Sequence, residues 1–144
     1  MPRCYLLTLA SSSSLDQQSN NVSLFNMVEQ INLPRGVEPP PGALLPIELH
    51  AYFQLDPTEL NQRFELRFVL VASSGLETST DAYPHKSATL RFRTRTMGMP
   101  VPPIADNYQV RVDTRAVGSE HWSRDPLAWP LIVALAEARP AVTH

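Results

Sequence analysis

Three arginines alternate along the stretch "SATLRFRTRTMGM" (87–99), at Arg91, Arg93 and Arg95. In a β-strand, alternate side chains point to the same face and lie about 6.6–7 Å apart. A guanidinium group recognises a carboxylate or a phosphate through two parallel hydrogen bonds. The spacing therefore predicts a basic face that could bind a phosphate, a carboxylate-bearing ligand or an acidic partner.

Further arginines fall on the polar sides of two other expected strands; they are Arg63, Arg67, Arg111 and Arg115. If those strands neighbour the first one, a single sheet face carries a basic patch. The candidate binding residues of that patch are Arg91, Arg93, Arg95 and Arg111. In the alternative interpretation the face is only solvated, and Glu65 and Asp113 pair with arginines across the strands. The sequence leaves both interpretations open.

Glu48 and His50 share one face of the stretch "IELHAYFQLD" (47–56). With a third group from elsewhere in the fold they could form a site, so both are candidate binding residues. An exposed histidine beside a carboxylate is also common in proteins that use neither residue. The other histidines and the single cysteine show no close metal-ligand spacing such as H-x-x-x-H; they are His85, His121, His144 and Cys4. We therefore expect no metal site.

Sequence motifs for catalysis and for cofactor binding are missing. The chain has no G-x-S-x-G, no G-x-x-x-x-G-K-[ST] and no G-x-G-x-x-G, and it contains only 5 glycines. Its aspartates are scattered singly, whereas a calcium-binding loop needs several close together. These observations predict a protein that is not an enzyme and that uses no cofactor.

Two aromatic residues and one loop offer other binding modes. Trp122 and Trp129 flank the stretch "SRDPLA" and would either stack a sugar or pack in the core. The proline-rich stretch "GVEPPPGALLP" (36–46) could adopt the polyproline II conformation and dock onto a partner. A carbohydrate ligand and a protein partner therefore both stay open.

The 144-residue chain is of single-domain size, and we expect one domain over residues 1–144. Its formal net charge of -2 at pH 7 gives no argument for nucleic acid binding. The apolar start, from Cys4 to Leu9, is shorter than a signal peptide needs, and no apolar run is long enough to span a membrane. With a single cysteine, this predicts a cytoplasmic protein with no membrane partner.

Alternation of apolar and polar residues predicts the elements that position these side chains. In "RFELRFVLV" (63–71) every second residue is apolar, which predicts a core face made of Phe64, Leu66, Phe68 and Leu70. The charged residues between them, Arg63, Glu65 and Arg67, are expected to face water. Apolar residues on otherwise polar sides of strands would mark an interface if they were contiguous; these are Val69, Val71 and Tyr52.

About seven such strands, separated by turn signals, predict an antiparallel β-sandwich, immunoglobulin-like or similar. The 14 prolines support strands and loops, because proline breaks helix interiors. The polar stretch 11–21 is expected to be a loop. The stretch 22–33 changes its apolar side midway, which predicts a strand with a β-bulge or, alternatively, a short helix. The stretch 128–135 is either a strand or a short helix.

The order of these patterns resembles that of a family of small bacterial proteins of unknown function. The similar parts are "CYLLTLASSSSLDQQSNNVSLFNMVEQINLP", then "LLPIELHAYFQL", a strand that ends in "ASSG", and the late "MPVPPIADNYQVRVDTRAVGSEHW". This chain departs from the family pattern at Asn26, where a glycine is expected, and near Glu29, where an aspartate is expected. The resemblance implies a β-sandwich and supplies no activity.

These observations predict a non-enzymatic binding or assembly module. We expect its partner to be a protein, and self-association into a homo-oligomer is one form of this. The alternative is a small ligand-binding or carbohydrate-binding protein, or an enzyme, with a site at the loop ends of the sandwich. That site would use Glu48, His50 and nearby arginines.

Overall fold

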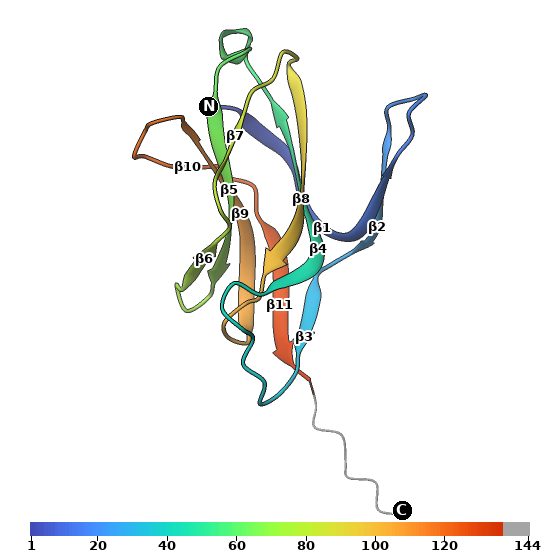
Figure 1. Ribbon diagram of the computed structural model, residues 1–144, viewed down its shortest axis with the longest axis vertical. Helices are drawn as coiled ribbons and strands as arrows, with labels where there is room; N and C mark the ends of the chain where they lie inside the picture. The colour runs from blue at the N-terminus through green and yellow to red at the C-terminus, as the bar shows by residue number, and fades with distance from the viewer. Residues whose placement is uncertain (137–144) are drawn as a thin grey trace, which may run out of the picture.

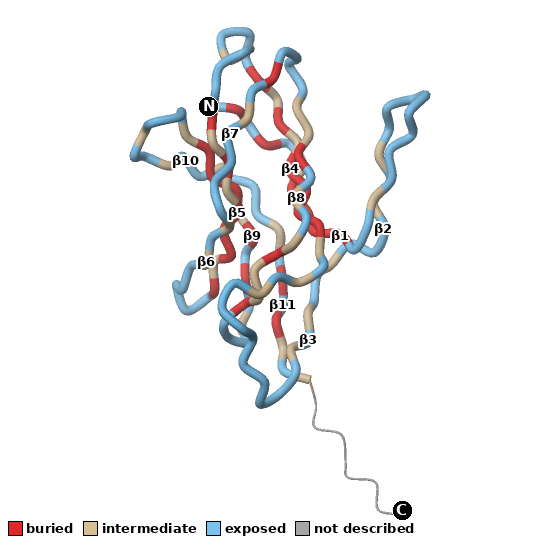
Figure 2. The backbone as a smooth tube through the Cα atoms, in the orientation of Figure 1, coloured by how far each residue is buried: buried red, intermediate tan, exposed pale blue. Residues whose placement is uncertain are grey.

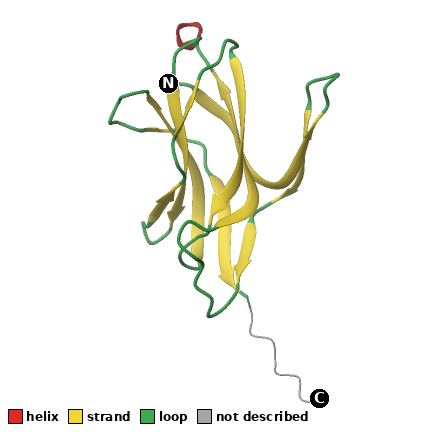
Figure 3. Ribbon diagram, in the orientation of Figure 1, coloured by secondary structure: helices red, strands yellow, loops and turns green. Residues whose placement is uncertain are grey.

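Two packed β-sheets make up residues 1–136, the part of the chain that the computed structural model describes (Figures 1 and 3). The small sheet has the order β2-β1-β4-β8, with strands β2 (Val22–Met27), β1 (Arg3–Leu15), β4 (Leu44–Gln54) and β8 (Arg91–Pro100). The large sheet has the order β3-β11-β9-β5-β6, with strands β3 (Gln30–Leu33), β11 (Trp129–Leu135), β9 (Asp106–Ala116), β5 (Phe64–Ala72) and β6 (Glu77–Ser79). This arrangement confirms the predicted all-β sandwich.

Short elements complete the structure. In the large sheet, β10 (Ser123–Arg124) pairs with β9, and β7 (Tyr83–His85) pairs with β5. A 3-10 turn, η1 (Pro57–Glu59), connects β4 to β5. Among the described strands, all pairs are antiparallel except β3 and β11, which are parallel. None of the described elements is a helix with the length and apolar character needed to cross a membrane.

The core lies between the facing sheets and follows the predicted alternation (Figure 2). The predicted core residues of β5 are confirmed, since each is only 2–3% exposed; they are Phe64, Leu66, Phe68 and Leu70. On the small sheet, the alternate residues Leu49, Ala51 and Phe53 are fully buried. The ring centroids of Phe53 and Phe64 lie 6.4 Å apart in an edge-to-face contact. Burying one such side chain contributes about 1.5–3 kcal/mol, so these two faces hold the sheets together.

Two expectations about the first third of the chain are wrong. The stretch 11–21 is not all loop, because β1 continues through the serine run to Leu15. The stretch 22–33 is neither one bulged strand nor a helix. It forms β2 in the small sheet and β3 in the large sheet, and the chain crosses between them at Val28 and Glu29. Near the other end of the described residues, the stretch 128–135 forms strand β11 and not a short helix.

Strand β1 pairs with two different strands along its length. Its first part, from Arg3 to Ala10, pairs with β4, and its last part, from Ala10 to Leu15, pairs with β2. The β1–β2 hairpin therefore leaves the sheet after Ala10 (blue in Figure 1). Contacts described below bring this hairpin back against the outer face of β4 and β8. This explains why Glu48 and His50 are buried although they point away from the core.

Candidate functional site

Strand β8 places its three arginines on the outer face of the small sheet. Across the β4–β8 ladder, Arg91 lies opposite Gln54, Arg93 opposite Tyr52, and Arg95 opposite His50. Directly paired residues of an antiparallel ladder share a face. The structure therefore brings the alternating arginines of β8 beside the Glu48–His50 pair, and these are the arginines near that pair.

The third group beside Glu48 and His50 is Ser13 from the hairpin. His50 Nε2 lies 2.9 Å from Glu48 Oε1, and the Ser13 hydroxyl donates to the same oxygen at 2.7 Å. Arg95 Nη1 lies 4.0 Å from Glu48 Oε2. Burial raises the pKa of the Glu48 carboxyl, but the hydrogen bonds from Ser13 and His50 and the charge of Arg95 outweigh it. The pKa of Glu48 is therefore lower than its ordinary value.

The order of this hydrogen-bond chain bears on its chemistry. In a Ser-His-acid triad the imidazole stands between the hydroxyl and the carboxylate, so that it can take the hydroxyl proton. Here the carboxylate of Glu48 stands between Ser13 and His50. The arrangement therefore anchors the hairpin to β4 rather than activating the serine.

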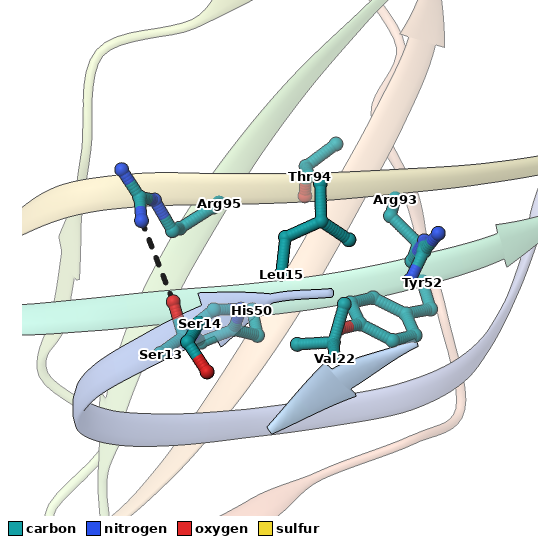
Figure 4. A pocket seen from close by; sticks show the side chains of 9 residues that line it. All are labelled: Ser13, Ser14, Leu15, Val22, His50, Tyr52, Arg93, Thr94 and Arg95. Atoms are coloured by element: carbon teal, nitrogen blue, oxygen red, sulfur yellow. Dashed lines mark hydrogen bonds between the residues drawn. The ribbon is translucent and has the colours of Figure 1, made fainter. Parts of the chain in front are cut away.

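A groove separates the end of the hairpin from β4 and β8 (Figure 4). Its first part is a hollow of about 400 Å³, lined by hairpin residues on one side and by β4 and β8 on the other; the lining residues are Ser13, Ser14, Leu15, Val22, His50, Tyr52, Arg93, Thr94 and Arg95. A second hollow of about 770 Å³ shares Val22, Tyr52 and Arg93 with the first and reaches Tyr5 and Arg91. The groove thus runs along the arginines of β8.

The three arginines of β8 differ in the contacts that hold their side chains. Arg93 Nη2 donates to the carbonyl of Asn20 at 2.9 Å, and its guanidinium carbon lies 5.7 Å from the centre of the Tyr52 ring. Arg95 Nη1 donates to Ser13 Oγ at 3.4 Å, and its side chain is 55% exposed. Arg91 is exposed. Within residues 1–136, Arg91 and Arg93 form no ion pair, and Arg95 forms only the 4.0 Å contact with Glu48.

Arg3 adds a fourth cation to this face, and the sequence analysis missed it. It pairs with Gln54, which also pairs with Arg91, so that both arginines flank one residue of β4. No pattern near the start of the chain revealed this, because the strand pairing alone places Arg3 there. Asp125 lines a separate hollow together with Arg3 and Arg91, but its carboxylate accepts hydrogen bonds from the backbone N–H groups of Cys4 and Leu127.

Arg111 does not belong to this face, which corrects the expectation of a single patch. It lies on β9 in the large sheet, where its guanidinium group donates to the carbonyls of Asp125 and Leu127 at 2.8 and 3.1 Å. It therefore holds the connection between β10 and β11. Alternation within a strand gives the face of a side chain but does not tell which strands share a sheet, and this is why the sequence combined Arg111 with the β8 arginines.

The other arginines of the large sheet form ion pairs, as the alternative interpretation predicts. Arg115 Nη2 lies 2.7 Å from Glu65 Oε2, and Arg67 Nε lies 3.0 Å from Asp113 Oδ2. The Asp113 carboxylate is 1% exposed and also accepts from Arg124 at 2.9 Å. These contacts make the face a structural network. Arg63 at its margin is exposed, as expected.

The aromatic and apolar candidates are largely engaged within the chain. The guanidinium carbons of Arg67 and Arg115 lie 4.3 and 4.1 Å from the centre of the Trp122 ring, which covers the surface that would stack a sugar. Trp129 packs against the core, and its indole N–H donates to the carbonyl of Val28. Val69 is 1% exposed, so it is not part of an exposed interface patch.

Comparisons with protein-family models, with curated proteins and with solved structures found no match to this chain. The site must therefore be interpreted from its own geometry. Within residues 1–136, no three side chains of His, Cys, Asp or Glu lie close enough together to hold a metal ion; His144 lies outside the described residues. The remaining chemistry of the site is that of guanidinium groups beside a groove.

Proposed function

We propose that the protein is a non-enzymatic binding module that takes an acidic segment of a protein partner on the outer face of β4 and β8. One observation carries the proposal. On the large sheet, Arg67, Arg115 and Arg124 are neutralised by carboxylates of the same chain and Arg111 is held by two carbonyls, whereas Arg91 and Arg93 pair with no carboxylate within the part of the chain described here. Arg95 is 4.0 Å from a carboxylate that His50 already contacts.

The support around these arginines favours binding. A flexible arginine loses rotamer freedom when it grips a ligand, and this costs about 1.5–2 kcal/mol. Arg93 is already held by the Asn20 carbonyl and lies over the Tyr52 ring. The Arg93 side chain has therefore already lost part of its rotamer freedom in the free protein, before a partner binds. Alternate residues repeat about every 6.6–7 Å along the strand, which matches the repeat of alternate side chains in an extended acidic segment.

Self-association is a second part of the proposal. The hairpin carries two exposed apolar side chains on β2, Phe25 and Met27, which are 48% and 58% exposed. Since β2 is an edge strand, a second copy could cover them. We expect a species larger than 16.1 kDa in sedimentation experiments at micromolar concentration. A purely monomeric protein, or an unchanged mass for a Phe25→Ser/Met27→Ser variant, would contradict this part. A cytoplasmic location, inferred from the sequence, is likewise part of the proposal.

A small-ligand function is the second candidate. The hollow of about 400 Å³ beneath the hairpin combines an aromatic wall at Tyr52 with cations at Arg93 and Arg95. It lies on the sheet face and not at the loop ends. A thermal-shift screen with inorganic phosphate, citrate and simple sugars separates the two candidates. Stabilisation by one of these compounds, lost in Tyr52→Ala, would favour the small ligand.

The main proposal is tested with a fluorescent peptide in which Glu alternates with Val. We expect wild-type protein to bind it at about 0.1 M salt and to lose most of the affinity near 1 M, because the Debye length falls from ~10 to ~3 Å. The Arg91→Gln/Arg95→Gln variant should bind at least about tenfold more weakly, since each charge-assisted hydrogen bond contributes about 1.5–3 kcal/mol. Arg63→Gln is the matched control and should bind as wild type. Equal binding of a Gln-Val peptide would refute the proposal.

A further inference from the structure

The backbone of β8 has a free side. Strand β8 is at the edge of the small sheet and pairs only with β4 among the described strands. Leu55 N–H donates to the carbonyl of Leu90 at 2.7 Å, so the backbone of Leu90 faces β4. In an antiparallel ladder this orientation repeats at every second residue. The residues that face β4 in the same way are Phe92, Thr94 and Thr96.

The remaining residues of β8 therefore turn their N–H and C=O groups to the open edge. They include Arg91, Arg93 and Arg95, whose side chains lie on the outer face. Arg93 and Arg95 thus offer both guanidinium groups and outward backbone groups, whereas the carbonyl of Arg91 already accepts a hydrogen bond from the Thr89 hydroxyl at 2.7 Å. An unpaired strand edge is a template for another extended chain.

We propose that the acidic partner segment binds as an added antiparallel β-strand along the open edge of β8. This inference rests on the proposed function and specifies how the segment is held. Backbone hydrogen bonds to the N–H and C=O groups of Arg93 and Arg95, and to the N–H group of Arg91, supply the alignment of the segment. Carboxylates on its outer face, each opposite one of these arginines, supply the specificity.

The register fixes the pattern of the segment. Residues opposite Arg91, Arg93 and Arg95 form hydrogen-bonded pairs, in which Cα atoms lie about 5.5 Å apart and side chains share a face. Acidic residues are therefore required at every second position. The residues between them point to the inner side of the edge, where Leu90 is 42% exposed. Apolar residues at these positions would cover it.

One end of the β8 edge borders an open hollow. Near the end of β8, a hollow of about 530 Å³ lies between Thr96–Gly98 and the segment from Thr78 to Tyr83. Tyr83, which also lines this hollow, is 51% exposed. This hollow is lined by Asp81, Thr96 and Met97 but by none of the three arginines, so the segment's carboxylates are expected at the Arg91–Arg95 end.

A second copy of this chain is a poor occupant of the same edge. If two β8 strands paired antiparallel about Arg93, each Arg91 would lie opposite an Arg95 of the other copy. Like charges placed directly opposite each other destabilise a strand pair. The charge pattern therefore selects an acidic partner and discourages self-pairing at this edge.

Backbone N-methylation of the peptide probe tests the inference with wild-type protein. In the proposed register, the amide N–H groups of the Glu residues point at β8, and those of the Val residues point away. One Glu-Val peptide is methylated on a central Glu amide, and a second on a central Val amide. The two peptides have the same composition and charge, so that each serves as the control of the other.

We expect the Glu-methylated peptide to bind at least about tenfold more weakly than the unmethylated peptide, and the Val-methylated peptide to bind within about twofold of it. Equal affinities of the two methylated peptides would overturn strand addition, while salt-dependent binding lost in Arg91→Gln/Arg95→Gln would still support the acidic-segment function. Absence of binding by the unmethylated peptide at low salt would overturn both. Isotope-edited NMR gives an independent readout, since the amide protons of Arg93 and Arg95 should become protected from exchange on binding.

Discussion

Ser13 Oγ lies 2.7 Å from Glu48 Oε1, although 35 positions separate the two residues in the chain. The contact ties the outer end of the β1–β2 hairpin to the middle of β4. Glu48 is 4% exposed, so its carboxylate depends on the partners that the fold supplies. The hairpin is therefore one wall of the groove and also the source of a hydrogen bond that keeps a buried charge satisfied.

Replacing Ser13 with Ala should destabilise the protein by about 1.5–3 kcal/mol, the usual contribution of a hydrogen bond to a charged group, while His50 still contacts the Glu48 carboxylate. The loss should be present at neutral pH and should disappear as the pH falls through the pKa of Glu48. The reason is that this pKa is lowered in the folded state, so its stabilisation exists only while the carboxylate is ionised. Urea denaturation at several pH values measures it. Ser12→Ala, at an exposed position, should change stability by less than about 0.5 kcal/mol.

Cys4 should be inert in the folded protein. Burial and the nearby charge of Asp125 raise the pKa of the thiol to about 12, despite backbone hydrogen bonds that lower it. The thiolate is the reactive form, and it is almost absent at pH 8. Iodoacetamide should therefore label native protein very slowly and urea-unfolded protein rapidly. Fast labelling of native protein, at a rate near that of a free thiol, would show that β1 opens locally or that Cys4 is accessible.

The alternation of residues predicted the faces of β4, β5, β8 and β9, because each of these strands has one side in the core. It failed for the second half of β1. That half covers the polar outer face of β4, where it meets Glu48, so it needs serines instead of apolar residues and has the composition of a loop. Alternation also says nothing about which strands become neighbours. The separation of Arg111 from Arg95 therefore emerged only from the sheet topology.

His85 should make the protein less stable at mildly acidic pH. Its ring lies 5.4 Å from the Phe92 ring and 5.9 Å from the Phe64 ring, and burial there lowers its pKa from the ordinary value of 6.5. The unfolded chain then binds a proton more readily than the folded one. Stability is complete above pH 6.5 and is lost as the pH falls through the folded pKa.

Thermal unfolding at pH 7.5 and pH 5.5 measures this dependence. In wild-type protein the melting temperature should be lower at the acidic pH. His85→Phe keeps an aromatic ring between Phe64 and Phe92 and has no proton to bind, so its melting temperature should fall by less. The other histidines are common to both proteins and cancel in the comparison. An equal fall in both proteins would show that His85 is not the group responsible.

Two arginine substitutions should separate structural from functional guanidinium groups. Arg67 neutralises the Asp113 carboxylate, which is 1% exposed, at a distance of 3.0 Å. Removing one partner of a buried ion pair leaves a charge without compensation and costs up to about 3–5 kcal/mol. Arg124 still contacts Asp113 in Arg67→Gln, and Arg67 is partly exposed, so we expect a smaller loss of about 1–3 kcal/mol.

Arg93→Gln is the matched change on the other sheet. Within the described residues Arg93 neutralises no carboxylate, and its loss removes one hydrogen bond to the exposed Asn20 carbonyl. We therefore expect its free energy of unfolding to stay within about 0.5 kcal/mol of wild type, the range of ordinary surface substitutions. The affinity for the Glu-Val peptide should show the reverse pattern. It should fall in Arg93→Gln and stay unchanged in Arg67→Gln. If Arg93→Gln instead unfolds in urea as early as Arg67→Gln and binds the peptide unchanged, the arginines of β8 are structural.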